Sequence, residues 1–193
     1  MHRVTVLDFA GFGESEEPAE PYGVPDYASD VISLLGIIGI KDAHFVGHSF
    51  GGRVCLELAA KFPHIVRSVA LVDSAGLKPR RGLKYYVKVG THKLLRRLGL
   101  KGLKGSSDYR TLSQVMRETF KKVVNYDQTP LLDSVRCPAA VFWGKDDGET
   151  PPYMARKLND GIRGSYLFWL DGGHFSYVDD SAKFIAILRA FIG

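Results

Sequence analysis

The chain has 193 residues, of which 45% are hydrophobic and 24% charged, with a formal net charge of +5. This length and composition suit a single domain with a sizeable core, and they argue against a disordered chain or a repeat array. No apolar run is long enough to span a bilayer, and the N-terminus lacks the order of charges and apolar residues typical of a signal peptide. We therefore expect one domain over residues 1–193, located in the cytoplasm.

The first part of the chain alternates strands with helices. Residues 4–7 predict a strand that enters a Gly- and Pro-rich loop over residues 11–25. The later apolar runs and helical periodicities predict, in chain order, a helix over 25–38, a strand over 43–46, a helix up to Phe62, which stops at Pro63, and a strand over 66–72.

The second part resumes this alternation with strands over 138–143 and 165–170, separated by a helix over 153–158, and a last helix over 182–191. Strands that are apolar on both faces and alternate with helices indicate a mainly parallel sheet with helices on both faces. The fold class is therefore α/β. Residues 76–130 interrupt the pattern with helical periodicity around 83–98 and 112–124, which predicts a helical lid insertion.

A candidate nucleophile lies between the second predicted strand and the following helix. The run Gly47-x-Ser49-x-Gly51 has the setting of a nucleophile elbow, in which a sharp turn makes a serine hydroxyl project from the sheet. The flanking glycines leave room for the strained turn and for close packing of the helix. His48 adjoins Ser49 in sequence, but neighbours across a tight turn point apart, so we interpret His48 as packing or as a wall of the substrate pocket.

A serine needs a base, and the base needs an acid behind it. His174 follows an apolar strand in the loop Asp171-Gly172-Gly173-His174, at the same edge of the sheet as the elbow. Two carboxylates, Asp146 and Asp147, compete as the acid in the loop after the preceding strand. Along the chain the candidates occur in the order Ser, Asp, His, which is the order that accompanies a nucleophile elbow.

Four motifs together resemble the α/β-hydrolase family, and more closely its lid-bearing esterase and carbon–carbon bond hydrolase branch. They are Asp8-x-x-Gly11-x-Gly13-x-Ser15, Gly47-His48-Ser49-Phe50-Gly51-Gly52, Gly144-x-x-Asp147-x-x-x-Pro151 and Gly172-Gly173-His174. The resemblance implies that Ser49 is the nucleophile, His174 the base and Asp147 the acid. It also implies that the backbone N–H of Phe50 donates to the oxyanion.

The sequence departs from the family at its start. Family members carry several strands and a His-Gly loop, which supplies a second oxyanion donor, before the segment that matches residues 4–15. Losing one such donor costs about 10²–10³ in turnover, so we expect a weakened enzyme. Three explanations stay open: a lost or misplaced start, a first strand that has moved into the gap beside residues 43–46, or a second copy of the chain that covers the exposed sheet edge.

The resemblance implies a hydrolase of carboxylic esters or related acyl substrates that works through an acyl-serine intermediate. A carbon–carbon bond hydrolase of anionic substrates and a non-catalytic binding protein are the alternatives. Cys55 and Cys137 show no metal-site spacing, and we expect no metal or cofactor.

Ten Lys or Arg residues and no Asp or Glu occur between Lys78 and Lys104, so the charge of the rest of the chain is −5. Three interpretations of this basic block stay open: the solvated face of a lid helix, a positive rim that recruits anionic substrates, and a helix that contacts a lipid surface. We expect no nucleic-acid partner.

Overall fold

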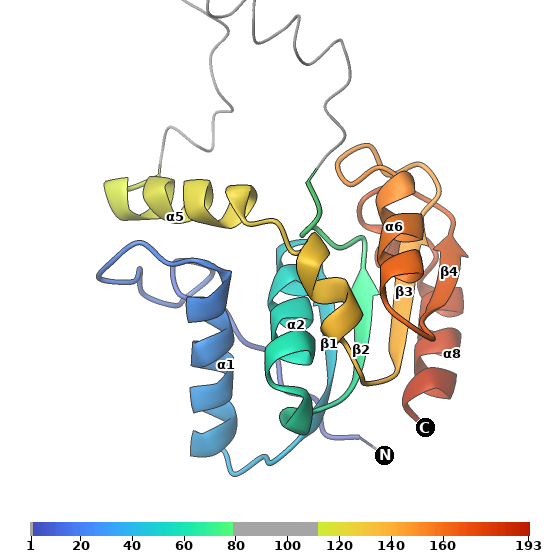
Figure 1. Cartoon of the computed structure of the whole chain (residues 1–193), viewed down its shortest axis with the longest axis horizontal. Coiled ribbons are helices and arrows are strands. Elements are labelled where there is room, and N and C mark those ends of the chain that lie inside the picture. The colour runs from blue at the N-terminus through green and yellow to red at the C-terminus, as the bar shows by residue number, and fades with distance from the viewer. Residues whose placement is uncertain (1, 79–111) are drawn as a thin grey trace, which may run out of the picture. The chain divides into compact units, whose positions relative to one another are not determined.

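The structure is a computed structural model that describes residues 2–78 and 112–193 (Figure 1). Contacts divide the chain into two compact units, residues 1–21 with 79–121 and residues 22–78 with 122–193. The second unit contains the sheet, the helices that cover it and all three residues of the predicted triad.

The sheet has four parallel strands in the order β1-β2-β3-β4: β1 (Ala43–His48), β2 (Val66–Val72), β3 (Ala139–Gly144) and β4 (Tyr166–Leu170). Each of these strands was predicted from its apolar run, and β3 is buried along its whole length. Because the strands are parallel, their carboxyl ends meet at one edge of the sheet, where ligands bind in open α/β sheets.

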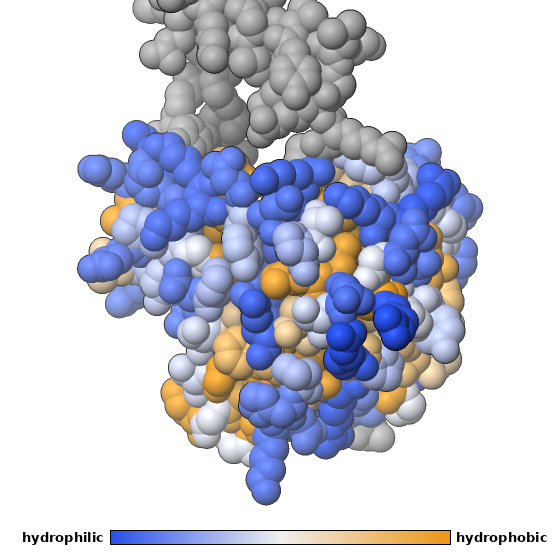
Figure 2. All heavy atoms as spheres, in the orientation of Figure 1, coloured by the Kyte–Doolittle hydropathy of each residue, from blue (hydrophilic) through white to orange (hydrophobic). Residues whose placement is uncertain are grey.

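Two helices cover one face of the sheet. The helix α2 (Phe50–Lys61) contacts β1 and β2, and α6 (Tyr153–Gly161) contacts β3 and β4. A third helix, α1 (Val24–Ile37), packs against α2, with Tyr27 and Ala28 fully buried. On this side of the molecule Figure 2 shows mostly hydrophilic residues with smaller hydrophobic areas between them, as expected for helices that turn their polar sides to solvent.

The opposite face is covered at β3 and β4 by α8 (Ser181–Ile192). Phe184, Ile187, Leu188 and Phe191 of this helix pack on a cluster that includes Phe142. The rings of Phe142 and Phe184 meet edge to face with centroids 5.0 Å apart. The prediction of a parallel sheet with helices on both faces is therefore confirmed.

Three short helices were not predicted: η1 (Pro63–Ile65), η2 (Thr129–Ser134) and α7 (Ser176–Asp179). Helices of three, six and four residues are too short to show a periodicity in the sequence. The helix predicted near 112–124 is present as α5 (Gln114–Asn125), and the N–H of Met116 donates to Ser113 Oγ at 3.1 Å at its first turn. Residues 79–111 lie outside the described residues, as does most of the basic block, so the lid over 76–130 stays a prediction.

The predicted first strand at residues 4–7 is wrong, because residues 2–9 form no strand in the structure. The explanation in which this strand fills the gap beside residues 43–46 is wrong for the same reason. Val4 and Val6 are 79% and 86% exposed, so burial gives this segment no stabilisation as a strand. A strand forms only where another strand accepts its backbone hydrogen bonds, which a local apolar pattern does not reveal.

The loop that follows residues 2–9 is compact. The carboxylate of Asp8 accepts the N–H of Glu14 at 3.1 Å, and Ser15 Oγ donates to the carbonyl of Asp8 at 2.8 Å. This loop contains the first of the four motifs. Among the helices of residues 2–78 and 112–193, none is both long and apolar enough to cross a membrane.

Candidate active site

Ser49 lies on the sharp turn between β1 and α2. Its backbone has φ 49° and ψ −109°, a conformation that residues with a side chain rarely adopt and that costs about 1–3 kcal/mol. The N–H of Ser49 donates to the carbonyl of Val72 at 3.0 Å, and its carbonyl accepts the N–H groups of Gly52 and Ala75, both at 3.1 Å. The bonds with Val72 and Ala75 attach the turn to β2 and to the loop after it, and the bond from Gly52 joins the turn to the start of α2. Together they hold the strained conformation.

Two glycines make this turn possible. A Cβ at Gly47 would lie 2.5 Å from the backbone of Gly51, and one at Gly52 would lie 2.1 Å from Ser74 Oγ. A Cβ at Gly51 would meet no atom within 4 Å. The second glycine of the pentapeptide, Gly51, is therefore not required by space, whereas Gly52, outside the pentapeptide, is.

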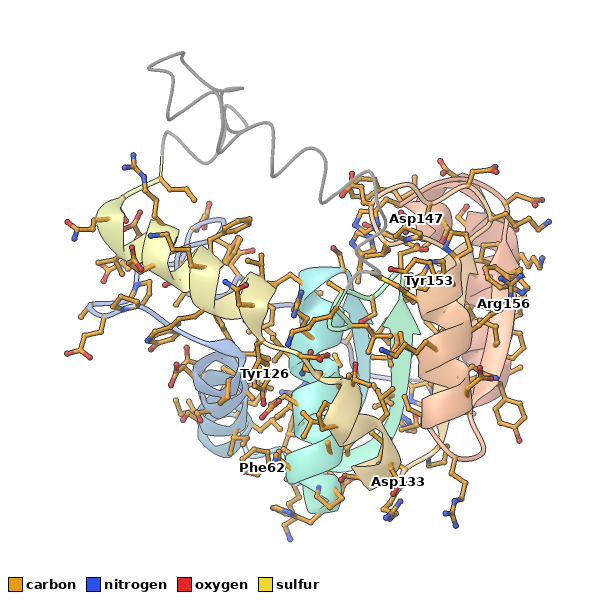
Figure 3. The ribbon with its side chains drawn as sticks, turned by 45° about the horizontal axis from the view of Figure 1, so that its top comes forward. Phe62, Tyr126, Asp133, Asp147, Tyr153 and Arg156 are labelled. Atoms are coloured by element: carbon orange, nitrogen blue, oxygen red, sulfur yellow. The ribbon has the colours of Figure 1, made fainter. Side chains whose placement is uncertain are left out.

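His174 reaches Ser49 from the loop after β4. Its Nε2 is 2.9 Å from Ser49 Oγ, and its Nδ1 is 2.9 Å from Asp147 Oδ2. Asp147 follows β3, and Figure 3 places it at the end of the sheet near Tyr153, opposite the end that holds Phe62 and Asp133. Three side chains that are distant in sequence thus form one hydrogen-bonded row at the carboxyl edge of the sheet.

Asp147 is 3% exposed and is surrounded by donors. Its Oδ1 accepts the N–H groups of Glu149 at 2.8 Å and Thr150 at 2.9 Å, and its Oδ2 accepts the hydroxyl of Thr150 at 2.5 Å besides the contact with His174. Burial raises the pKa of Asp147, but these hydrogen bonds outweigh it and hold the pKa below its usual value. An ionised Asp147 places the proton of His174 on Nδ1 and leaves Nε2 able to accept from Ser49.

The two carboxylates that compete in the sequence differ in the structure. Asp146 is exposed, and its backbone N–H donates to the carbonyl of Gly172 at 3.0 Å. Of these two, Asp147 is the one whose carboxylate lies within hydrogen-bonding distance of His174 Nδ1. The geometry therefore selects Asp147 as the candidate acid.

Asp73 is a buried carboxylate that the sequence interpretation missed. It follows β2 with φ 43°, accepts the N–H of Gly144 at 2.7 Å and accepts the hydroxyl of Ser176 at 2.5 Å. Burial raises its pKa more than its two hydrogen bonds lower it. Its position directly after a buried strand, like that of Asp147 after β3, is the signal that could have found it.

Thr150 was missed as well. Its hydroxyl lies 2.5 Å from Asp147 Oδ2, 3.3 Å from His174 Nδ1 and 3.2 Å from the carbonyl of Asp73. The carbonyl of Thr150 in turn accepts the indole N–H of Trp143 at 2.8 Å. This threonine connects the candidate acid, the candidate base and the end of β2.

His48 contacts the loop that carries the candidate base. Its Nε2 donates to the carbonyl of His174 at 2.6 Å, and its ring lies 4.9 Å from the His174 ring and 5.1 Å from the Phe175 ring. These contacts agree with the prediction that His48 has a packing role, whereas its role as a wall of the substrate pocket stays a prediction. Phe50 is the first residue of α2, at the end of a helix where N–H groups point outward. Its role as oxyanion donor also stays a prediction.

Both cysteines are free thiols that do not belong to the row of three side chains. Cys55 is buried on α2, and burial raises its pKa to about 12, so it stays protonated at neutral pH. Cys137 is half-buried, and burial raises its pKa too. In the part of the chain that the structure describes, no three His, Cys, Asp or Glu side chains gather as a metal site would require.

Comparison with known proteins shows a similarity to alpha/beta hydrolases. A family model described as alpha/beta hydrolase fold matches residues 1–91. The chain is 28% identical to Uncharacterized protein Mb2734 of Mycobacterium bovis, over 98% of this chain and 68% of that protein. It is 40% identical to the 2-hydroxymuconate semialdehyde hydrolase of Pseudomonas putida over 76 residues, which are 39% of this chain and 27% of that enzyme.

Solved structures agree with the family model. The crystal structure of the enol-lactonase from Burkholderia xenovorans LB400 matches with a TM-score of 0.73 and 24% identity, over 96% of this chain and 78% of that one. At this identity the match shows the fold alone. The parallel sheet, the family model and this match agree on one architecture, and the chain has the α/β-hydrolase fold.

Proposed function

We propose that this chain is a serine hydrolase that cleaves carboxylic esters or related acyl substrates through an acyl-serine intermediate. The observation that carries the proposal is the row Ser49–His174–Asp147, with 2.9 Å at each of its two contacts. Such a row supplies the three groups that acyl transfer to a serine needs: a hydroxyl, a base that can accept its proton and an ionised acid that orients the base.

In the first half of the proposed reaction, Ser49 Oγ attacks the carbonyl carbon of the substrate while its proton moves to His174 Nε2. The imidazolium that forms is stabilised by the carboxylate of Asp147. The tetrahedral intermediate then collapses, the bond to the leaving group breaks, and the proton on Nε2 passes to the leaving-group oxygen. The acyl group stays on Ser49 as an ester.

In the second half, a water molecule takes the place of the leaving group and gives its proton to His174 Nε2 as its oxygen attacks the acyl carbon. Collapse of this second intermediate returns the proton to Ser49 Oγ and releases the carboxylic acid. In both halves the negative charge develops on the former carbonyl oxygen. The proposed donor to that oxygen is the backbone N–H of Phe50, where the dipole of α2 also favours negative charge.

A carbon–carbon bond hydrolase is the second candidate. The observation that favours it is the 40% identity to 2-hydroxymuconate semialdehyde hydrolase over 76 residues. The match covers 27% of that enzyme, so it supports carbon–carbon bond cleavage less directly than the row of three side chains supports ester cleavage. Turnover of a 2-hydroxy-6-oxo-dienoate at a rate above that of simple esters would favour this candidate.

A non-catalytic binding protein is the third candidate, and active-site labelling separates it from the other two. A fluorophosphonate should form an adduct on Ser49 that peptide mass spectrometry locates, and a Ser49→Ala variant should lose both the adduct and turnover of p-nitrophenyl acetate. Ser74, buried close to Gly52, offers the matched control Ser74→Ala. An unlabelled Ser49, under conditions that label a control esterase, would favour the binding protein.

A further inference from the structure

A carboxylate outside the row lies beside the candidate base. Glu149 Oε2 is 3.5 Å from His174 Nε2, the same nitrogen that lies 2.9 Å from Ser49 Oγ. The imidazole is 9% exposed, whereas the side chain of Glu149 is 73% exposed. Glu149 therefore brings a negative charge from the solvent side to the nitrogen that handles the proton.

The backbone of Glu149 is fixed although its side chain is exposed. Its N–H donates to Asp147 Oδ1 at 2.8 Å, and the next residue, Thr150, donates to the same oxygen at 2.9 Å. The loop thus wraps the candidate acid and starts the Glu149 side chain from a set position. The backbone from which the carboxylate reaches Nε2 is held as long as Asp147 keeps these two donors.

The position of Glu149 beside His174 Nε2 places its carboxylate near the leaving group of a bound substrate. In acyl transfer to a serine, Nε2 hands its proton to the leaving-group atom, so the leaving group lies against Nε2 when the bond breaks. A carboxylate near this nitrogen therefore lies near the leaving group. It repels a leaving group that carries negative charge and attracts one that carries positive charge.

Building on the proposed function, we propose that Glu149 is a specificity-determining residue that selects substrates with cationic or neutral leaving groups over anionic ones. The effect is moderate because the side chain is exposed. Two unit charges separated by about 4 Å in water interact with about 1 kcal/mol, which corresponds to about a fivefold change in rate. The direction is opposite to that of an anion-recruiting basic block, so the two hypotheses make different predictions for the same substrates.

The test compares three aryl acetates that share the acyl group and differ only in the leaving group. The ring carries a 4-carboxylate, a 4-carboxylic methyl ester or a 4-trimethylammonium group, and kcat/KM is measured for each with the wild type and Glu149→Gln. In the variant we expect the ratio of the anionic to the neutral ester to rise about fivefold and the ratio of the cationic to the neutral ester to fall about fivefold. Both changes should shrink in about 1 M salt, where the Debye length is about 3 Å.

Asp146→Asn is the matched control, since it removes an exposed carboxylate from the same loop and should leave both ratios unchanged. Equal changes for all three esters in Glu149→Gln, or no change at all, would overturn the assignment of specificity to Glu149. A Ser49→Ala variant, measured with the same esters, tests the proposed function separately. If it keeps full turnover, the serine pathway fails, whereas unaltered ratios with Ser49-dependent turnover contradict only the role of Glu149.

Discussion

Replacing Asp147 by Asn should lower kcat by about 10⁴, the loss associated with the wrong tautomer of the base in a Ser-His-Asp triad. The structure explains why the amide cannot substitute. Asp147 Oδ1 accepts two backbone N–H groups, from Glu149 and Thr150, so the oxygen of an Asn must stay at that position. Its NH₂ group then faces His174 Nδ1, which must lose its proton to accept this bond. The proton moves to Nε2, and Ser49 loses its acceptor.

The assay is the hydrolysis of p-nitrophenyl acetate, followed as kcat and KM. Asp146→Asn should stay within about twofold of the wild type, because its exposed carboxylate lies outside the row. The loss in Asp147→Asn should appear in kcat rather than in KM, since tautomer and orientation matter most in the transition state. An Asp147→Asn variant that keeps more than about a tenth of the wild-type kcat would refute the reasoning, as would an equal loss in Asp146→Asn.

Stability provides a second measurement on the same variant. The pKa of Asp147 is lower in the folded state than in the unfolded chain, so the folded protein binds the proton more weakly. Asp147 therefore stabilises the fold above the ordinary Asp pKa of about 4, and this contribution is lost as the pH falls through the folded-state value. The difference in unfolding free energy between the wild type and Asp147→Asn should accordingly shrink in acid.

Three further variants test the surroundings of the site. His48→Phe keeps the ring packing but cannot donate to the carbonyl of His174, so it should lower kcat/KM about five- to tenfold. The control is His44→Phe, farther along the same face of β1, which should leave kcat/KM unchanged. Asp73→Asn should gain stability relative to the wild type as the pH rises above about 4 in urea unfolding, because burial raises the pKa of Asp73 and its charged form opposes folding. If a second copy of the chain covers the outer edge of β1, light scattering should show a dimer that Val46→Lys, a change at a half-exposed strand position, converts to a monomer.

The part of the fold that a local pattern encodes could be predicted from the sequence. The strands β2 and β3 are short apolar runs, and the helix α1 shows its apolar residues at helical spacing. The pattern failed at residues 4–7, which have a strand-like composition but form no strand. Their environment, not their propensity, decides this, and the sequence of one segment does not describe its environment.

The candidate site divides in the same way. Ser49 and His174 could be found because the chemistry of acyl transfer demands a serine on a turn and a histidine at the same sheet edge. Glu149 and Thr150 could not be found from the sequence, because only the path of the loop around Asp147 brings their side chains close to His174. A carboxylate and a hydroxyl in a loop are ordinary turn residues until three-dimensional contacts bring them to an imidazole.

The strand that contributes no member of the row still controls the site. The residues at the end of β2 accept a hydrogen bond from Ser49 at Val72 and from Gly144 and Ser176 at Asp73, so they fix the nucleophile turn, the start of the Asp147 loop and the segment after His174. Damage at this strand end should therefore displace all three side chains of the candidate site at once. Such a variant would lose activity although Ser49, His174 and Asp147 are all still present. Among variants of this kind, kcat should fall in proportion to the loss in unfolding free energy. Removal of the proposed nucleophile alone, as in Ser49→Ala, should instead leave stability intact.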